Sequence, residues 1–368
     1  MAGLPFLLRR PWLMLRDLCV DRDRPDLDGL RAIQDPERFV WAVLPHAART
    51  FSACIVLLPA GPAKAAAVAY LYCRILDTYE DLCPDPSARE ALLLGFVERL
   101  QADPDPPPPP PIEAPALKDD RDRAHLLLIE KCDLVDRVYL ELPAEVRAIT
   151  RRLVRDMAEG MCWSSRVFGE QGGVLQDGAQ VARYCHNVMG NPVLFTLRLL
   201  RHDRSGETEL PAELEQSALE VSEMIQLANI TRDIEKDLLR GVSYGAALRD
   251  DLGRQVDGDV SLAGRVRDAR RELMRAALSR APAYRALIDA MEQPHFSPAR
   301  ASALLMLLFT DRYYRSCARR AGLAAWGGRT PGLRLVLQSL PAVWSRRWAR
   351  NVCDRVEQDF LNAADGGG

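Results

Sequence analysis

The stretch YLYCRILDTYEDLC, residues 70–83, places three carboxylates, Asp77, Glu80 and Asp81, in an otherwise apolar segment. Its apolar residues recur at three- and four-residue spacing, which predicts a helix. Residues three and four apart share one face of a helix, so the three carboxyl groups are expected to lie side by side. Like charges crowded on an apolar-flanked helix repel each other, and desolvation raises that cost. A divalent cation would remove both costs.

A second polar stripe lies far downstream, in QLANITRDIEKDLLRG, residues 226–241. Asn229, Asp233 and Asp237 are spaced i, i+4, i+8, so they form one line along a second predicted helix. Its flanks are apolar, as they are around the first group. The two segments therefore present similar sets of oxygen ligands.

Acidic pairs at this spacing are common enough to need context. With 51 acids among 368 residues, roughly seven i/i+4 pairs arise by chance. Glu141/Glu145 and Glu209/Glu213 have the same spacing, but they flank prolines in polar surroundings and indicate surface charges at helix ends. The apolar flanks distinguish the two candidate groups from these pairs.

The type of ligand indicates the metal. Oxygen ligands without His or Cys suit Mg²⁺ or Mn²⁺. Mg²⁺ completes its shell with substrate phosphates, so two carboxylate helices suggest a bound diphosphate. Arg74 and Arg232 lie close to the first aspartate of each group and could bind the same anion. The alternative is two solvated, salt-bridged helix faces.

The rest of the chain predicts an all-α protein with one large helical domain. Helical periodicity fills nearly every long segment, and no convincing alternating strand pattern occurs. The expected helices are 37–58, 61–82, 87–102, 119–141, 143–168, 178–201, 211–240, 261–292, 297–320 and 333–362. We divide the chain into an N-terminal segment (1–36), the helical domain (37–325) and a C-terminal amphipathic helix with a flexible tail (326–368).

The segment DPDPPPPPPIEAP, residues 103–115, cannot be helical, because proline lacks an N–H and fixes φ. We expect a Pro-rich loop over 103–118 that acts as a solvated spacer between helices. A ligand for a proline-reading domain is the alternative.

Composition excludes several classes of protein. The chain has 49 basic and 51 acidic residues, which argues against a general nucleic-acid binder. Nine scattered cysteines without a CxxC pair indicate reduced thiols in a cytoplasmic protein. The start, MAGLPFLLRRPWLML, is broken by Arg9 and Arg10 and is followed by no small-residue cleavage site, so we keep it as mature chain. No run reaches ~18 apolar residues, so no transmembrane helix is expected.

Four motifs carry a resemblance to a known family: RTFS (49–52), YLYCRILDTYED (70–81), YCHNVMGNP (184–192) and QLANITRDIEKD (226–237). In their order and separations they resemble the squalene and phytoene synthases over roughly residues 40–320, and LDTYED and YCHNVMG look closer to squalene synthases. The resemblance implies an isoprenoid-synthase-type helical bundle. It also implies a central active-site cavity with the two carboxylate helices facing each other across its mouth.

The resemblance also implies roles for individual residues. Arg49, Arg74 and Arg232 would contact diphosphate, and Tyr184 would take part in proton removal near the cyclopropane-forming step. We treat His186 as a structural histidine. The implied metal-site residues are Asp77, Glu80, Asp81, Asn229, Asp233 and Asp237. The expected substrate-binding residues, from the same motifs, are Phe51, Ser52, Tyr70 and Gln226.

The expected enzyme is a squalene synthase-like prenyltransferase of the farnesyl-diphosphate farnesyltransferase type. It would condense two farnesyl diphosphates head to head, through presqualene diphosphate, to squalene with Mg²⁺ and NADPH. Mg²⁺ and Arg would stabilise the departing pyrophosphate, and a dry pocket would protect the carbocation. Alternatives are a phytoene or dehydrosqualene synthase without reductant, a presqualene diphosphate synthase, or a non-catalytic assembly protein.

The sequence also suggests where a cofactor and a membrane would contact the protein. We look for cofactor and second-site residues in the segment 295–320. The segment 333–352 mixes Leu, Val and Trp with Arg, so it either packs on the bundle, which we favour, or lies at a bilayer surface. We expect a cytoplasmic monomer, with peripheral membrane contact as the alternative.

Overall fold

The computed structural model describes residues 6–113, 115, 117, 119–290, 296–323, 326, 328 and 330–365. Over these ranges every named element is a helix, and one isolated bridge joins Val174 and Ser243, which confirms the all-α prediction. The first five residues of the expected N-terminal segment and the last three of the expected tail lie outside the described residues. Within the described chain, no helix has the length and apolar content needed to cross a bilayer.

The chain forms two compact units. The first comprises Met1–Cys162 and Phe195–Glu209, and the second comprises Trp163–Leu194 and Leu210–Gly368. Two long helices, α9 (Ala144–Glu170) and α11 (Asn191–Ser205), contribute residues to both.

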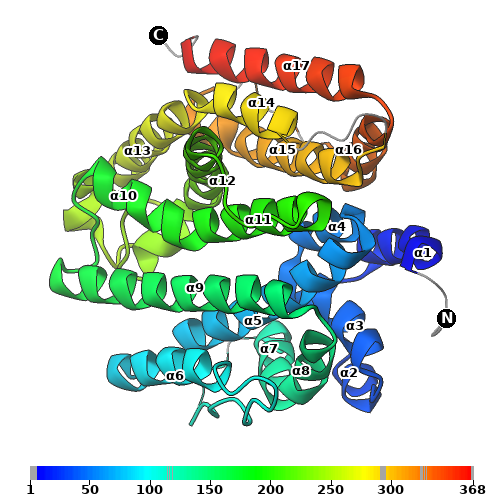
Figure 1. Ribbon diagram of the computed structural model, residues 1–368. Helices are drawn as coiled ribbons and strands as arrows, with labels where there is room; N and C mark the ends of the chain where they lie inside the picture. Colours follow the sequence, from blue (N-terminus) through cyan, green and yellow to red (C-terminus); the bar gives the residue numbers. More distant parts are fainter. Residues whose placement is uncertain are drawn as a thin grey trace. The chain divides into compact units, whose positions relative to one another are not determined.

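The first unit is built around α5. Its other helices are α1 (Phe6–Cys19), α2 (Leu27–Ala32), α3 (Pro36–Ala48), α4 (Thr50–Leu57), α6 (Pro86–Arg99), α7 (Asp120–Glu130) and α8 (Cys132–Leu140). α5 (Ala60–Leu82) contacts α3, α4, α6, α7 and α8 (Figure 1). Its first half is rich in buried alanines, which let neighbouring helices approach closely, and its second half carries the first carboxylate group.

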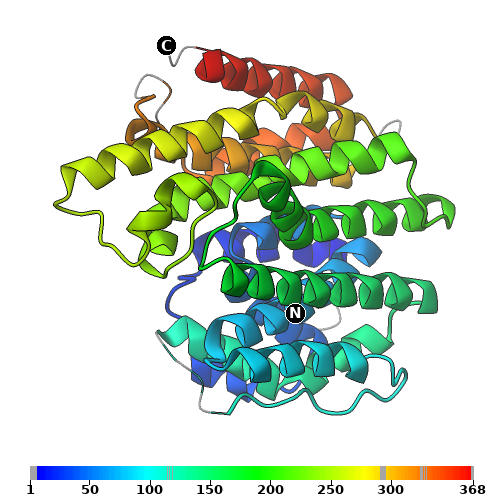
Figure 2. The ribbon, with the colours of Figure 1, turned by 90° about the vertical axis from the view of Figure 1, so that its left-hand side faces the viewer.

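The second unit is built around α12 (Ala212–Leu239), which contacts η1, α13, α14 and α15. α17 lies against α14, as Figures 1 and 2 both show. The other named elements of the second unit are α10 (Gly178–Cys185), η1 (His186–Gly190), η2 (Ala246–Asp251), α13 (Val260–Leu278), α14 (Ala281–Ala290), α15 (Pro298–Cys317), η3 (Ala318–Ala321), α16 (Gly332–Ser339), η5 (Leu340–Val343) and α17 (Arg346–Asp365). The second polar stripe therefore lies on the helix around which its unit is packed.

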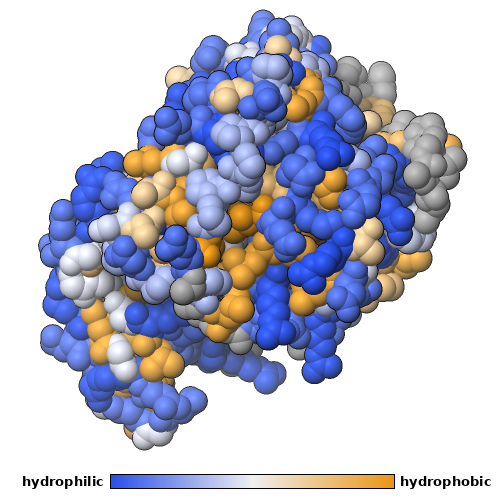
Figure 3. Space-filling view, turned by 90° about the horizontal axis from the view of Figure 1, so that it is seen from below, coloured by the Kyte–Doolittle hydropathy of each residue, from blue (hydrophilic) through white to orange (hydrophobic). Residues whose placement is uncertain are grey.

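Helix starts follow local side-chain chemistry. An N-cap side chain accepts a hydrogen bond from a first-turn N–H that has no partner inside the helix. The capping residues are Asp26, Asp35, Asp85, Asp119, Asp177, Asp259 and Ser297. Six of the 51 acidic residues therefore cap helix N-termini. On the surface, Figure 3 shows one face of the molecule that is mostly hydrophilic, with smaller hydrophobic areas between the polar residues.

Several helices expected to be continuous are interrupted. The expected helix 37–58 breaks at Arg49, and 119–141 breaks at Lys131. The expected helices 261–292 and 333–362 are interrupted at 279–280 and 340–345, whereas 178–201 is helical throughout and widens to a π-helical turn at 186–190. Apolar periodicity resumes after each break because the next helix packs on the same core, so the pattern alone hides the break. The helices α1 and α2 were not predicted at all.

The last turns of α3, before the break at Arg49, contain a proline. Pro45 lies inside α3 and has no N–H to donate to the carbonyl of Trp41. The guanidinium of Arg16 donates to that carbonyl instead. The helix ends three residues later, at Ala48.

The Pro-rich segment is partly solvated, as expected of a spacer, but it also makes specific contacts with the first unit. Residues 103–110, which we call the proline strap, are non-helical as predicted, but they are fastened to the first unit. Arg99 Nε donates to the carbonyl of Pro107 at 2.6 Å, and the Tyr79 hydroxyl donates to the carbonyl of Pro110 at 2.7 Å. The strap is therefore attached to the surface of the first unit by hydrogen bonds.

A buried ion pair lies beneath the strap. The guanidinium of Arg99 binds both oxygens of Asp136 at 3.3 and 2.5 Å, and Asp136 also accepts a hydrogen bond from the Tyr72 hydroxyl at 2.7 Å. The Arg99 side chain is 2% exposed and that of Asp136 is 10% exposed. Removing either charge would leave the other buried without its partner.

We therefore expect Asp136→Ala to destabilise the protein by about 3–5 kcal/mol. The matched control is Asp133→Ala in the same helix, whose pair with Arg137 is 60% and 62% exposed and should contribute at most about 0.5 kcal/mol. Chemical denaturation measures both. Equal losses in the two variants would contradict the assignment of the buried pair as a stability element.

Candidate active site

The first carboxylate group lies at the C-terminal end of α5, where Asp77 and Glu80 are partly buried and Asp81 is exposed. Arg74 Nη1 lies 3.1 Å from Asp77 Oδ2. Burial raises the pKa of Asp77, against the charge of Arg74. Burial and the charges of Asp77 and Asp81 raise the pKa of Glu80 to about 8. The crowding expected from the spacing is present, and a bound cation would relieve it.

Two of the predicted substrate-binding residues lie beside this group. The rings of Phe51 and Tyr70 are 5.9 Å apart between centroids, and the Arg74 guanidinium lies 5.9 Å from the Tyr70 ring centroid. Arg74 also donates to the Tyr70 hydroxyl at 3.3 Å. Ser52 differs, because its side chain is buried and hydrogen bonds to Asp17 in the core.

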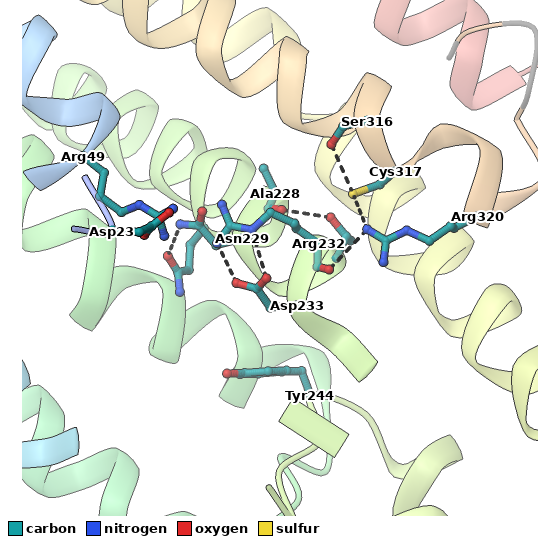
Figure 4. A network of polar contacts seen from close by, with 12 residues as sticks. Asp23, Arg49, Ala228, Asn229, Arg232, Asp233, Tyr244, Ser316, Cys317 and Arg320 are labelled. Atoms are coloured by element: carbon teal, nitrogen blue, oxygen red, sulfur yellow. Dashed lines mark hydrogen bonds and ion pairs between the residues drawn. The ribbon is translucent and has the colours of Figure 1, made fainter. Parts of the chain in front are cut away.

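Arg49 joins α3 to α4 with an unusual backbone. Its φ of 51° and ψ of −118° fall where residues with a Cβ are strained. Its side chain is 53% exposed and lies 3.9 Å from Asp23 (Figure 4). Such strain persists where the surrounding structure enforces it, and it is frequent at ligand-binding positions. This outlier coincides with a residue predicted to bind diphosphate.

Because glycine adopts this conformation without strain, we expect Arg49→Gly to be more stable than Arg49→Ala by about 1 kcal/mol. Both variants lose the guanidinium, so the difference between them isolates the backbone. Chemical denaturation measures the two free energies of unfolding. An alanine variant as stable as the glycine variant would contradict the strain.

The second polar group lies on α12. The buried side chain of Gln226 accepts a hydrogen bond from Asn229 Nδ2 at 3.1 Å, so it orients Asn229 rather than facing open solvent. Arg232 binds Asp233 through two hydrogen bonds of 3.0 and 2.5 Å (Figure 4). Burial and the charge of Asp233 raise the pKa of Asp237 to about 6. A guanidinium and an aspartate are again paired beside a second carboxylate.

Three cationic or aromatic side chains that the sequence did not single out support this part of α12. The guanidinium of Arg232 lies 5.0 Å from the Tyr313 ring centroid. Arg320 donates to the Arg232 carbonyl at 3.4 Å (Figure 4), and Arg270, which is 2% exposed, donates to the Thr231 carbonyl at 2.8 Å. Tyr313 and Arg320 belong to the segment 295–320, where further site residues were expected.

Tyr184 is part of an aromatic group in the second unit. The Tyr244 hydroxyl donates to the Tyr184 hydroxyl at 3.4 Å, and the two ring centroids are 5.2 Å apart. Phe168 meets both rings edge-on. Tyr244 was missed because its segment, GVSYG (241–245), shows only a glycine-flanked turn in the sequence.

His186 has the structural role expected of it. It begins the π-helical turn η1, and its Nε2 lies 2.9 Å from Glu223 Oε1. Arg280 Nη2 lies 2.5 Å from the other oxygen of Glu223. A Cβ on Gly190 would lie 3.1 Å from Leu219, so glycine lets η1 pack closely on α12. This packing holds the turn that follows Tyr184.

Burial alone would raise the pKa of Glu223, but the hydrogen bond from His186 and the charge of Arg280 hold that pKa below its usual value. A carboxyl with a lowered folded-state pKa stabilises the fold above its unfolded pKa, and that contribution is lost as pH falls through the folded value. We therefore expect Glu223→Gln to destabilise the protein at pH 7. The loss should shrink below about pH 4.5.

Thermal unfolding between pH 3.5 and 8 measures this difference. The exposed Glu213 on the same helix supplies the control, Glu213→Gln, which should follow wild type throughout. A loss for Glu223→Gln that is the same at both ends of the range would exclude the electrostatic origin.

The donor set fits magnesium. Within the part of the chain that the structure describes, no group of three or more His, Cys, Asp or Glu side chains forms a ready ion cage. Mg²⁺ uses one or two carboxylates together with water and substrate phosphates, so an open carboxylate group suits it better than a closed cage. The crowding at Glu80 and Asp237 is the observation that favours a cation. That both groups serve one substrate stays a prediction, as does the expected central cavity.

Comparison with known proteins identifies related chains. A family model described as squalene/phytoene synthase matches residues 44–338. A solved complex of TcSQS with the ligand E5700 has a TM-score of 0.62 at 18% identity, covering 90% of this chain and 98% of that one. A complex of TcSQS with BPH1237 has a TM-score of 0.64 at 16% identity, covering 90% and 99%. No curated protein matches. At these identities the likeness shows the fold, an all-α isoprenoid-synthase fold.

Proposed function

The chain belongs to the squalene/phytoene synthase family, whose members are prenyltransferases of isoprenoid biosynthesis, and we propose that it condenses two farnesyl diphosphates head to head to squalene. One observation carries the proposal. Both acidic motifs are intact, and each has an arginine paired with its first aspartate, Arg74 with Asp77 and Arg232 with Asp233. Carboxylates that bind a divalent metal, beside arginines that bind phosphate, are the groups that this reaction requires.

The arginines bind the diphosphate in this proposal. A guanidinium carries five N–H donors, so Arg74 and Arg232 can each hold an aspartate and a phosphate oxygen together. Arg49 is half-exposed and adds a third positive charge. Mg²⁺, bound by the carboxylates, supplies Lewis-acid stabilisation of the leaving pyrophosphate.

Tyr184 moves the proton in the cyclopropane-forming step. A phenol with an ordinary pKa near 10 is a weak base, so it needs an acceptor for its own proton. In this proposal that acceptor is pyrophosphate or water, and the Tyr244 hydroxyl, which donates to the Tyr184 hydroxyl at 3.4 Å, helps to orient the phenol. Tyr244 is the orienting partner.

The product separates this proposal from its alternatives. Purified full-length protein is incubated with Mg²⁺ and farnesyl or geranylgeranyl diphosphate, with and without NADPH. Squalene that forms only with NADPH supports the proposal, whereas phytoene, or the same C30 product in both tubes, contradicts it. Accumulation of presqualene diphosphate in both tubes points to the shorter reaction, and no turnover points to an assembly protein.

The carboxylates should be essential for turnover. We expect Asp81→Asn and Asp233→Asn each to lower kcat by about a hundredfold or more, because each removes a charge from the metal site. The fold should persist, since Asp81 is exposed and Asp233 is 37% exposed. Glu145→Gln, in an acidic pair of the same spacing on an exposed helix end, is the control. Wild-type turnover in both aspartate variants would refute the metal assignment.

We also propose that the second unit touches an anionic bilayer surface. Residues 330–353 contain four arginines and no acidic residue. Four apolar side chains in this segment are exposed: Leu333, Leu337, Trp344 and Trp348. The exposed ring of Phe296 contacts that of Trp344. Tryptophan with arginine is typical of interfacial helices.

We expect Trp344→Ser to lower the fraction of protein that sediments with anionic vesicles. Val260→Ser, which also removes an exposed apolar side chain, is the control and should bind as wild type does. An unchanged bound fraction in Trp344→Ser would refute the contact.

A further inference from the structure

The second half of α5 has two opposite faces. Asp77 and Glu80 are partly exposed on one, whereas Tyr79, between them in sequence, is fully buried on the other. The hydroxyl of Tyr79 donates to the carbonyl of Pro110 in the proline strap at 2.7 Å. The strap therefore binds the carboxylate helix within the very turn that carries the carboxylates.

The strap is itself anchored at several points. The side chain of Asp103 binds Arg147 and Arg151 of α9, and the Pro107 carbonyl accepts from Arg99 Nε at 2.6 Å. At Gly95 of α6 an added Cβ would lie 3.3 Å from Pro110 Cγ, so the strap lies directly on that helix. Consecutive prolines lose little conformational entropy on folding, which makes the strap a stiff support.

A second contact holds α5 one helical heptad earlier. Tyr72, seven residues before Tyr79 and therefore on the same face, donates to Asp136 at 2.7 Å. Asp136 binds Arg99, which in turn holds the strap. Both tyrosine rings also meet Phe96 edge-on. The strap, α6, α8 and α5 thus form one closed hydrogen-bonded circuit on the face of α5 opposite the carboxylates.

We propose that the proline strap, acting through the Tyr79–Pro110 hydrogen bond, is a positioning element for Asp77, Glu80 and Asp81. The last turn of a helix lacks intrahelical partners for its carbonyl groups and frays readily. Asp81 lies one residue before the end of α5, so an outside support decides whether the three carboxylates keep a common arrangement. The inference rests on the proposed function in one respect, that these carboxylates bind a divalent metal.

The test compares two substitutions that delete the same group. Tyr79→Phe removes only the hydroxyl that binds the strap. Tyr284→Phe is the matched control, because Tyr284 is also buried and its hydroxyl donates to a backbone carbonyl, that of Ala303, at 3.1 Å. Both variants should lose a similar free energy of unfolding. Any difference between them in other measurements then reports the loss of the contact between α5 and the strap, and not a general loss of stability.

We expect three differences. Amide hydrogen exchange over residues 78–83 should quicken in Tyr79→Phe and stay as in wild type in Tyr284→Phe. The affinity for Mn²⁺, followed by electron paramagnetic resonance, should fall by about tenfold in Tyr79→Phe alone. The Mg²⁺ concentration for half-maximal turnover should rise, with kcat at saturating Mg²⁺ changed less. A second variant that replaces residues 106–110 by Gly and Ser at the same length should reproduce these changes.

The outcomes separate the two proposals. If wild type neither binds Mn²⁺ nor turns over prenyl diphosphate, the proposed function fails, and amide exchange still decides whether the strap holds α5. If wild type binds Mn²⁺ and exchange and affinity are the same in Tyr79→Phe and Tyr284→Phe, the strap is only a connection between helices and the inference is overturned.

Discussion

Carboxylates held close together on partly buried helix faces are the constraint on which the rest of the structure depends. At the end of α5, burial and mutual repulsion raise the pKa of Glu80 to about 8, and on α12 they raise that of Asp237 to about 6. Neither arrangement is favourable for folding, because an apolar or singly charged face would avoid the cost. Its retention in two helices is understandable when a divalent cation neutralises the carboxylates and in turn binds an anionic substrate.

Each helix balances the constraint in the same two ways. An arginine pairs with the first aspartate, Arg74 with Asp77 and Arg232 with Asp233, so that only part of the negative charge is uncompensated. Tyrosines then fix the backbone from the buried side. Tyr79 ties α5 to the strap, and Tyr314 of α15 donates to the Met224 carbonyl of α12 at 2.5 Å. The ion pairs with arginine lower the repulsion between the carboxylates. The tyrosine hydrogen bonds keep each helix from moving in response to the repulsion that is left.

The sequence predicts the parts of this arrangement that are local. Period and spacing predict α5, α12 and the clustering of their carboxylates, because those follow from helix geometry alone. The nearest arginines are also predicted, since they lie one or three residues away. The breaks within helices are not, because Arg49 and Lys131 lie in apolar patterns that continue on both sides. Near Arg49, the donor to the carbonyl that Pro45 leaves free, Arg16, comes from a helix that the pattern does not show.

Contacts between distant segments account for the remaining differences. Proline composition correctly excludes a helix over residues 103–110, but it says nothing about where the freed carbonyl groups find donors. Those donors, Arg99 and Tyr79, look like ordinary members of their own helices in the sequence. Ser52 shows the reverse, a residue in a family-like motif whose hydroxyl is occupied in the core by Asp17. A sequence motif therefore predicts which region of the chain forms a site. The direction of each side chain decides whether a residue of the motif contacts substrate or supports another residue that does.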